Sequence, residues 1–315
     1  MAIDVLLLLA LPASGKSELR RYLAHVTPEV ALRDFHLGPT LQVDDYPYVH
    51  LMRRISQEQR QLGLEPSFFA DEATPFLHAG DWLTLSHLIA EDVAGLGVIE
   101  HRPDTAAALI DRLNAARARA GVAATISTNP ALEDLIAADA AALTAGLTVA
   151  DHSTLDESTI VVEFARGGPE GAVAPLPAPL GYAASLAALG GDILERASVL
   201  WVVADPAESR RRNRERAHPG PDGDASILHH GVPEAVMLHD YGMDDLAWLA
   251  ETSPVPGTIA VDDGEVASLL PLARFDNRVD RTSFLRAEPE AWSQEAVTRL
   301  HHDLAAAFTA LVDAG

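Results

Sequence analysis

The residues with the clearest chemistry lie between two apolar segments near the start of the chain. An unbroken run, Val5–Leu9, is typical of a buried parallel strand, and helical spacing resumes after Gly15. A helix that begins there directs its free N–H groups and the positive end of its dipole at the preceding loop, which favours an anion. Lys16 is the only lysine of the 315 residues. Together with the Ser17 hydroxyl, it predicts a phosphate site with Mg²⁺ at the serine.

This stretch resembles the Walker A motif of P-loop kinases, G-x-x-x-x-G-K-[ST], with Ala10 in place of the first glycine. Alanine can leave a strand at negative φ, so the loop can still form with a less free first turn. The resemblance implies ATP as the bound nucleotide, with its phosphates on Pro12, Ala13, Ser14, Gly15, Lys16, Ser17 and Glu18. The alternative is a chance Gly-Lys-Ser after an apolar run.

Two adjacent carboxylates, Asp44 and Asp45, follow a short predicted strand at Leu41–Val43. Ligands of open α/β sheets bind outside the carboxyl ends of the strands, which predicts that both side chains lie at such a site. The segment resembles the D-D-[FY]-Y element of uridine kinase and phosphoribulokinase relatives. In that family an aspartate accepts or orients the proton of the substrate hydroxyl. Pro47 interrupts the pattern, so only the aspartates take over the role, and an ordinary acidic turn is the alternative.

A third strand is predicted at Thr159–Phe164, a β-branched run with Glu163 near its end. It resembles a Walker B strand, whose acidic residue contacts Mg²⁺ through water or directs the attacking group. The resemblance therefore implies a magnesium site formed by Ser17, Asp44 and Glu163. Arg166 follows at the same rim, where it could contact the acceptor or the phosphates. The alternative for Glu163 is solvation of a strand edge.

Five arginines occur within residues 210–216, after a predicted strand at Val199–Val203 and an Asp-Pro helix start. Arg212 and Arg216 lie one turn apart on a single helix face. The arrangement resembles the lid helix of nucleoside monophosphate kinases, whose arginines close over the phosphates and stabilise the transferring group. We expect an arginine lid and a mobile loop over residues 205–245. A solvated basic face is the alternative.

The composition narrows the range of partners. The 46 acidic and 23 basic residues give a net charge of −23, a field that repels nucleic acid polymers and anionic membranes. No apolar stretch has the length of a membrane span and the N-terminus lacks a basic region, so we expect a cytoplasmic protein without a membrane partner. The chain has no cysteine, and the spacing of His229, His230 and His239 fits no zinc signature.

Five short apolar runs separated by helices indicate a three-layer α/β/α fold with a roughly five-stranded parallel sheet, formed by residues 1–315 as a single domain. Together with the motifs, this pattern predicts a P-loop NTPase fold with helical insertions. The fifth run is 258–261, and the resemblance implies that residues 262–265 lie behind the adenine. Residues 182–197 are predicted to form one helix, whereas the polar stretch 274–281 receives no assignment.

The segment between the second and third strands, residues 46–150, is expected to be a helical insertion that binds the acceptor. It contains Ala-rich helices predicted at 105–120 and 130–146. Arg53 and Arg54 could hold an anionic acceptor in this region. The alternative is that both arginines lie on a solvated helix face.

The order of loop, acidic pair, acidic strand end and arginine lid predicts an ATP-dependent phosphotransferase that moves the γ-phosphoryl group to a small hydroxyl or phosphate acceptor. A nucleoside- or nucleotide-like acceptor is the leading expectation. The expected catalytic residues are Lys16, Asp44, Asp45, Glu163, Arg212 and Arg216. A nucleotide-binding regulatory NTPase without a small acceptor is the first alternative, and a binder without turnover is the second. GTP as donor and the oligomeric state stay open.

Overall fold

A computed structural model describes residues 2–96, 105–146, 157–216, 231–264 and 267–315. They form an α/β structure around a mixed sheet of six strands in the order β2-β3-β1-β4-β6-β5. Neighbouring strands are parallel except β5 and β6, which pair antiparallel at one edge. The strand bounds are β1 Val5–Leu9, β2 Thr40–Asp44, β3 Thr159–Phe164, β4 Ala197–Val203, β5 Thr258–Asp262 and β6 Ala267–Asp276.

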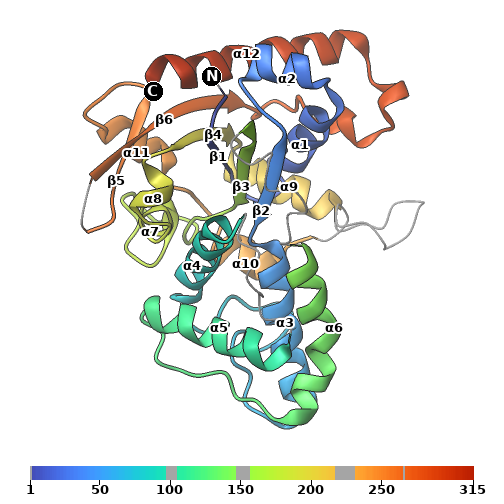
Figure 1. The fold of residues 1–315 in the computed structure, drawn as a ribbon, viewed down its shortest axis with the longest axis vertical. Helices are drawn as coiled ribbons and strands as arrows, with labels where there is room; N and C mark the ends of the chain where they lie inside the picture. Colours follow the sequence, from blue (N-terminus) through green and yellow to red (C-terminus); the bar gives the residue numbers. More distant parts are fainter. Residues whose placement is uncertain (1, 97–104, 147–156, 217–230, 265–266) are drawn as a thin grey trace.

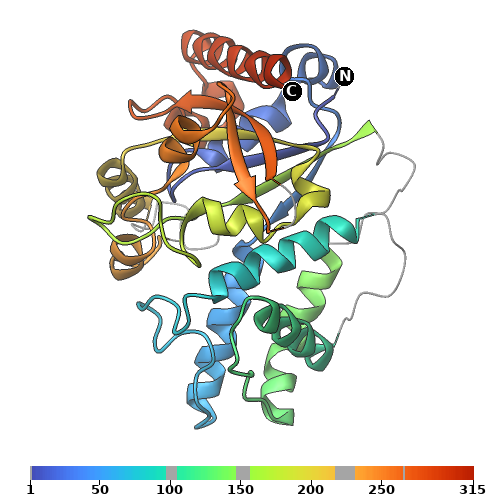
Figure 2. The same cartoon turned by 90° about the vertical axis from the view of Figure 1, so that its left-hand side faces the viewer.

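Helices cover both faces of the sheet, because successive side chains of each strand point to opposite sides (Figures 1 and 2). Leu6 and Leu8 of β1 belong to the core beneath α1 Lys16–His25, α2 Pro28–Phe35 and α12 Gln294–Ala314. Leu7 and Leu9 belong to the opposite core, which is covered by α4 Asp81–Ala94, α7 Gly181–Ala187, α8 Gly191–Leu194 and α11 Leu246–Thr252. This burial on both sides explains why β1 is apolar at every position.

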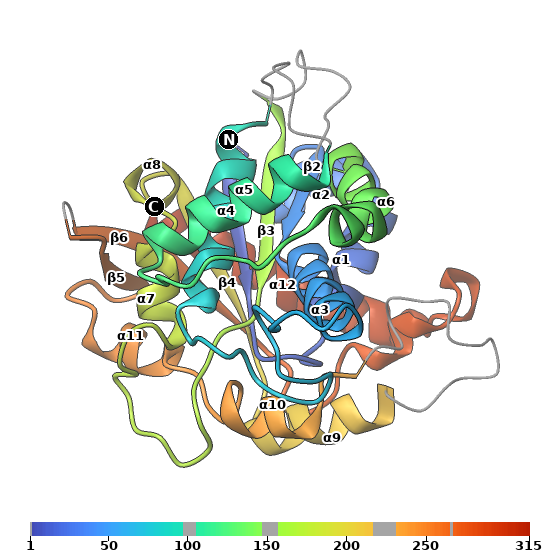
Figure 3. The ribbon, with the colours of Figure 1, turned by 90° about the horizontal axis from the view of Figure 1, so that it is seen from below.

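A further group of helices lies below the sheet, on the side that α4 covers (Figures 1 and 2), and Figure 3 views this group from below. Leu11 and Phe68 belong to a third core, to which α4 and four other helices contribute: α3 Tyr46–Gln61, α5 Ala106–Arg119, α6 Pro130–Gly146 and α10 Glu234–His239. The two Ala-rich helices are therefore confirmed. Residues 97–104 and 147–150 of the predicted insertion lie outside the described residues.

The sheet differs from the sequence-based prediction at one edge. The expected fifth strand exists as β5, but it runs antiparallel to β6, so residues 262–264 lie at the amino ends of the parallel strands. The prediction that 262–265 lie behind the adenine is therefore wrong for the described part, and residue 265 lies outside it. The fifth parallel strand is β6, which includes part of the unassigned stretch 274–281. Pro271 concealed this strand, because proline lacks the N–H of a central strand.

Two helical predictions also change. Residues 182–197 form α7 and α8 rather than one helix, because the chain passes between them through Gly190 at a φ of +85°. Helix α2 occupies a segment that the sequence pattern left as a linker.

The remaining elements are α9 Pro206–Arg216 and the short 3₁₀ helices η3 Ser283–Arg286 and η4 Pro289–Ala291. In the described parts of the chain, no helix has the length and apolar character needed to cross a membrane.

The end of β6 holds the loop that follows β1. Asn277 is fully buried, and its Nδ2 donates to the Ser14 carbonyl at 2.8 Å and to Thr282 Oγ1 at 3.0 Å. Its Oδ1 accepts from the Arg281 backbone N–H at 2.8 Å. A Cβ on Gly15 would approach the side chains of Asn277 and Thr282 to 2.6 Å, so only glycine fits there. The side-chain amide of Asn277 thus fixes the position of the loop.

We expect Asn277→Ala to lower the free energy of unfolding by about 1–3 kcal/mol, because it leaves buried partners without hydrogen bonds. Urea denaturation measures the change. The neighbouring substitution Arg278→Ala is the control, since Arg278 is exposed and pairs only with Asp276 in the described contacts. Equal stability of the two variants would contradict the anchoring role of Asn277.

Candidate functional site

The loop between β1 and α1 has the backbone of an anion site despite the missing glycine. Positive φ occurs at Ala13, at +54°, and at Gly15, at +106°, whereas Ala10 keeps a negative φ. The expectation that alanine can leave the strand at negative φ is therefore confirmed. The Ser209 hydroxyl of α9 donates to the Pro12 carbonyl at 2.6 Å and ties the loop to a second element. This contact and that of Asn277 with Ser14 both use carbonyl oxygens of the loop and none of its N–H groups.

Lys16 is held inside this loop. Its side chain is buried, and Nζ donates to the Ala10 carbonyl at 2.9 Å. Burial lowers the pKa of the ammonium, whereas the nearby carboxylates of Glu163 and Asp45 offset part of this effect. The ammonium therefore lies between the loop and the acidic strand ends, where its positive charge favours the binding of an anion.

The carboxylates predicted as magnesium ligands lie side by side. Asp44 at the end of β2 is in register with Glu163 of β3, and Glu163 is in register with Leu8 of β1. Arg20 of α1 contacts both, at 2.7 Å from Glu163 Oε2 and 3.7 Å from Asp44 Oδ2. Burial raises the pKa of Asp44 to about 6, with a further contribution from Glu163 and Asp45. This cluster of negative charge fits a cation.

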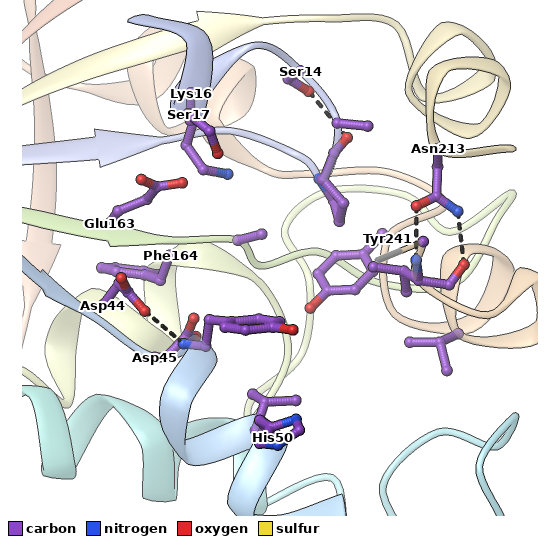
Figure 4. Close-up of a pocket in the computed structure, with 18 of the residues that line it drawn as sticks. Ser14, Lys16, Ser17, Asp44, Asp45, His50, Glu163, Phe164, Asn213 and Tyr241 are labelled. Atoms are coloured by element: carbon purple, nitrogen blue, oxygen red, sulfur yellow. Dashed lines mark hydrogen bonds between the residues drawn. The ribbon is translucent and has the colours of Figure 1, made fainter. Parts of the chain in front are cut away.

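Ser17 faces the same cavity as these two carboxylates (Figure 4). Hydroxyl and carboxylate oxygens are the ligands that Mg²⁺ prefers, and the ion commonly keeps several waters and bonds to substrate phosphates. The donor set of Ser17, Asp44 and Glu163 therefore fits magnesium brought with a nucleotide. Among the described residues, no group of three or more His, Asp or Glu side chains is arranged as a metal site on its own.

Asp45 has a different environment from Asp44. Its Oδ2 accepts from Nη1 of Arg166, whose guanidinium is buried and also donates to Ser185 Oγ at 3.1 Å. The guanidinium carbon of Arg166 lies 4.9 Å from the Phe164 ring centroid and 5.1 Å from that of Trp82. Arg166 does not line the cavity, so it orients Asp45 instead of contacting a ligand directly.

The two predicted lid arginines have different positions. Arg212 is buried, donates to Glu208 at 2.7 Å and to the Asn277 carbonyl at 2.8 Å, and does not line the cavity. We therefore correct its predicted role to that of a residue that supports the loop. Arg216 does line the cavity, where it pairs with Glu18 at 2.7 Å.

Glu18 was expected to bind phosphates as part of the loop, but its side chain lies elsewhere. It is buried between Arg216 and Arg286, which lie 2.7 and 2.8 Å from its Oε1. Burial acts to raise the pKa of Glu18, but the two guanidinium groups outweigh it, and the pKa is lowered. The carboxylate of Glu18 therefore positions Arg216.

The predicted lid is described only in part. The Asn213 side chain joins α9 to Val232 by two hydrogen bonds. Residues 217–230 of the predicted lid lie outside the described residues.

A cavity of about 910 Å³ begins at the loop and continues to the helical group. Figure 4 shows the loop residues and acidic strand ends at one part of it, with Tyr241 and His50 at another. Beyond Asp45, its wall is formed by four aromatic residues in contact. We call this part the aromatic compartment, and its rings are those of Phe69, Phe76, Trp82 and Tyr241.

Some charged and aromatic residues of α3 line the cavity, whereas others contact different parts of the structure. Arg53 lies over the Phe69 ring at 3.9 Å and lines the cavity, whereas Arg54 pairs with Glu58 and Asp139 on another side. Tyr46 lines the cavity. Tyr48 is buried, where its hydroxyl donates to Asp92 at 2.6 Å. Pro47 fits the first turn of α3, where no N–H is needed.

Several residues of the site escaped the sequence-based prediction. Arg20 lies one helical turn after Lys16, and this spacing was the signal that could have placed it at the carboxylates. Asn277 and the aromatic compartment come from segments far apart in the chain, and no local pattern connects them.

Comparison with protein-family models, with curated proteins and with solved structures finds no significant match to this chain.

The raised pKa of Asp44 predicts a pH-dependent effect of Asp44→Asn on stability. Above its ordinary pKa of 3.8, and fully above about 6, the folded protein bears the cost of an ionised Asp44. The substitution removes this cost, so we expect a higher free energy of unfolding than that of the original chain at about pH 8 and a much smaller difference at about pH 4, where the aspartate is protonated.

Urea denaturation at several pH values measures this difference. The control is Glu295→Gln, which removes an exposed carboxylate of α12. A stability gain of Asp44→Asn that stays the same from acid to alkaline pH would show that the charge of Asp44 is not its source.

Proposed function

We propose that this chain is an ATP-dependent phosphotransferase with a P-loop NTPase fold, which moves the γ-phosphoryl group of Mg·ATP to a hydroxyl group of a small molecule. The observation that supports it best is a continuous cavity that joins the phosphate-type loop, the acidic strand ends and the aromatic compartment. The central strand β1 lies between β3 and β4, and ligands of open α/β sheets bind outside the carboxyl ends of such strands.

In this proposal the loop side of the cavity binds the nucleotide. The N–H groups of residues 13–17 and the start of α1 hold the phosphates, and Lys16 contacts the β- and γ-phosphates. Ser17, Asp44 and Glu163 hold Mg²⁺, which neutralises phosphate charge when it is bound. Arg20 contributes positive charge beside the carboxylates, and Arg216 faces the same space.

The acceptor lies on the aromatic side, with its hydroxyl at Asp45. The hydroxyl oxygen forms a bond to the γ-phosphorus while the bond from that phosphorus to the β–γ bridging oxygen breaks. ADP leaves with the electron pair, and the hydroxyl proton passes to the Asp45 carboxylate. Arg166 fixes the orientation of Asp45, so the carboxylate meets the hydroxyl without rearrangement.

The presence of the aromatic compartment in the same cavity favours transfer to an acceptor over a regulatory NTPase. A regulator that only hydrolyses its nucleotide needs a water at the γ-phosphate and no further ligand site. Here the cavity extends to α10 and to Phe76, beyond the loop residues that would hold the triphosphate group of a nucleotide. The measurement that separates the two functions is whether ADP release depends on an added hydroxyl compound.

We expect Lys16→Ala to lower phosphoryl transfer by about 10²–10³-fold, because it removes a positive charge aimed at the transferring group. Release of ADP and formation of phosphorylated product are measured with ATP, Mg²⁺ and a panel of nucleosides, sugars and amino alcohols. Arg299→Ala is the control, since Arg299 is exposed on α12 and pairs with Glu295.

Undiminished ATP turnover by the Lys16→Ala variant would contradict the proposed function at its centre. Slow ADP release that no acceptor accelerates would instead support the regulatory NTPase. Tight ATP binding with no turnover under any condition would support a binder without catalysis.

A further inference from the structure

The carbonyl groups of the loop after β1 accept hydrogen bonds from side chains of three different segments. Side chains of α9 and of the segment after β6 hold the carbonyls of Pro12 and Ser14. At the start of the loop, the hydroxyl of Tyr182 in α7 donates to the Ala10 carbonyl at 3.0 Å, and both residues are fully buried. Tyr182 belongs to the core on the opposite side of the sheet from α1, so the loop is supported from both sides.

The Ala10 carbonyl is shared between Tyr182 and Lys16. Lys16 Nζ donates to the same oxygen at 2.9 Å, and a carbonyl oxygen has two lone pairs, so it can accept both bonds. The carbonyls of Pro12 and Ser14 form no bond with the lysine in the described contacts. Of the three supporting side chains, Tyr182 is therefore the one that holds the partner of the ammonium.

Tyr182 is itself fixed in place. Its backbone N–H donates to Asp245 Oδ1 at 2.6 Å, and the N–H of Ala183 donates to Oδ2 at 3.3 Å. Burial raises the pKa of Tyr182 well above its ordinary value, so the hydroxyl keeps its proton and acts as a donor. The Phe164 carbonyl lies 3.5 Å from this hydroxyl, farther than the Ala10 carbonyl. The proton of the hydroxyl is therefore directed at Ala10.

The direction of the Lys16 ammonium depends on this carbonyl. A lysine side chain is flexible, so its ammonium stays in one place only when it has a fixed partner. The nearby carboxylates of Glu163 and Asp45 pair with arginines instead. In the described contacts, the Ala10 carbonyl is the hydrogen-bond partner of Nζ. A change in the orientation of this carbonyl would therefore release the ammonium.

We propose that Tyr182 is a positioning residue, which holds Lys16 in the orientation for phosphate contact by donating to the carbonyl that both residues share. The assignment rests on the proposed phosphotransferase function, because that function makes Lys16 a phosphate ligand. Tyr182 does not line the cavity, so it acts through Lys16 and touches neither nucleotide nor acceptor. It supports the loop at Ala10, the residue that replaces the first glycine of the Walker A pattern.

The single lysine of the chain makes the test direct. Protein labelled with ¹³C-lysine gives one lysine side-chain spin system, that of Lys16, and NMR relaxation measures the order of its Cε–H bonds without nucleotide. We expect an order parameter above about 0.6 in the original protein, because the ammonium is held. Tyr182→Phe removes the hydroxyl and keeps the ring, and it is expected to lower this value below about 0.6.

The second measurement is the affinity for Mg·ATP, determined by calorimetry. A lysine side chain that is no longer held must be ordered when the phosphates bind, which costs binding free energy. We therefore expect Tyr182→Phe to weaken Mg·ATP binding about 3- to 10-fold.

Two control variants separate positioning of Lys16 from general loosening of the structure. Ser209→Ala removes the hydroxyl that supports the Pro12 carbonyl, and it is expected to leave the order of Lys16 unchanged. Tyr48→Phe removes another buried tyrosine hydroxyl, which donates to Asp92 away from the loop. It is expected to change neither the order of Lys16 nor, beyond about twofold, the affinity for Mg·ATP.

An order parameter below about 0.6 in the original protein would overturn the inference, and this outcome needs no variant to fold. Equal order in the original and Tyr182→Phe proteins, an equal loss in Ser209→Ala, or unchanged Mg·ATP affinity despite a released lysine would also overturn it. The proposed function fails in a different way. If the original protein binds no Mg·ATP while Tyr182→Phe still releases Lys16, the phosphotransferase is rejected and Tyr182 remains the residue that holds the lysine.

Discussion

The parallel register of β1, β3 and β2 is the constraint on which the site depends. It places Leu8 beside Glu163 and Glu163 beside Asp44, so two carboxylates are held together next to the loop that follows β1. Burial of an ionised carboxylate beside like charges costs free energy, and burial first, with Glu163 and Asp45 second, raises the pKa of Asp44 to about 6. Arg20 offsets part of this cost. The same unbalanced charge makes the edge suitable for a cation.

Several arginines hold residues of the site in place and do not line the cavity themselves. Arg166 orients Asp45, and Arg212 links α9 to the carbonyl of Asn277, which in turn holds the loop. A planar guanidinium with five donors can join segments that are distant in sequence, and a lysine ammonium cannot do so with the same geometry. Lys16 is the ammonium inside the loop, whereas the buried guanidinium groups of Arg166 and Arg212 fix the surrounding framework.

The two parts of the cavity are joined through the start of α3. Asp44 ends β2, Asp45 follows it, and α3 begins at Tyr46, so the acidic edge and the wall of the aromatic compartment are one continuous piece of chain. The compartment is completed from the other side by α10 and by Tyr241, which follows shortly after this helix, and Asn213 of α9 is hydrogen-bonded to Val232 just before α10. Under the proposed function, nucleotide and acceptor would therefore be held by elements that share a rigid sheet edge, which favours positioning as the main source of rate enhancement.

The sequence by itself determined β1, the loop and the acidic strand ends, because an unbroken apolar strand, a glycine before a helix and carboxylates after strands are local patterns. It also indicated the Ala-rich helices α5 and α6. It missed β6, where Pro271 interrupts the strand pattern, and it assigned Arg212 to a ligand although this residue is buried and paired with Glu208. Only the tertiary structure decided these roles, together with the aromatic compartment. Such features depend on which side chains from distant segments meet, and burial and charge pairing are properties of that meeting rather than of any local pattern.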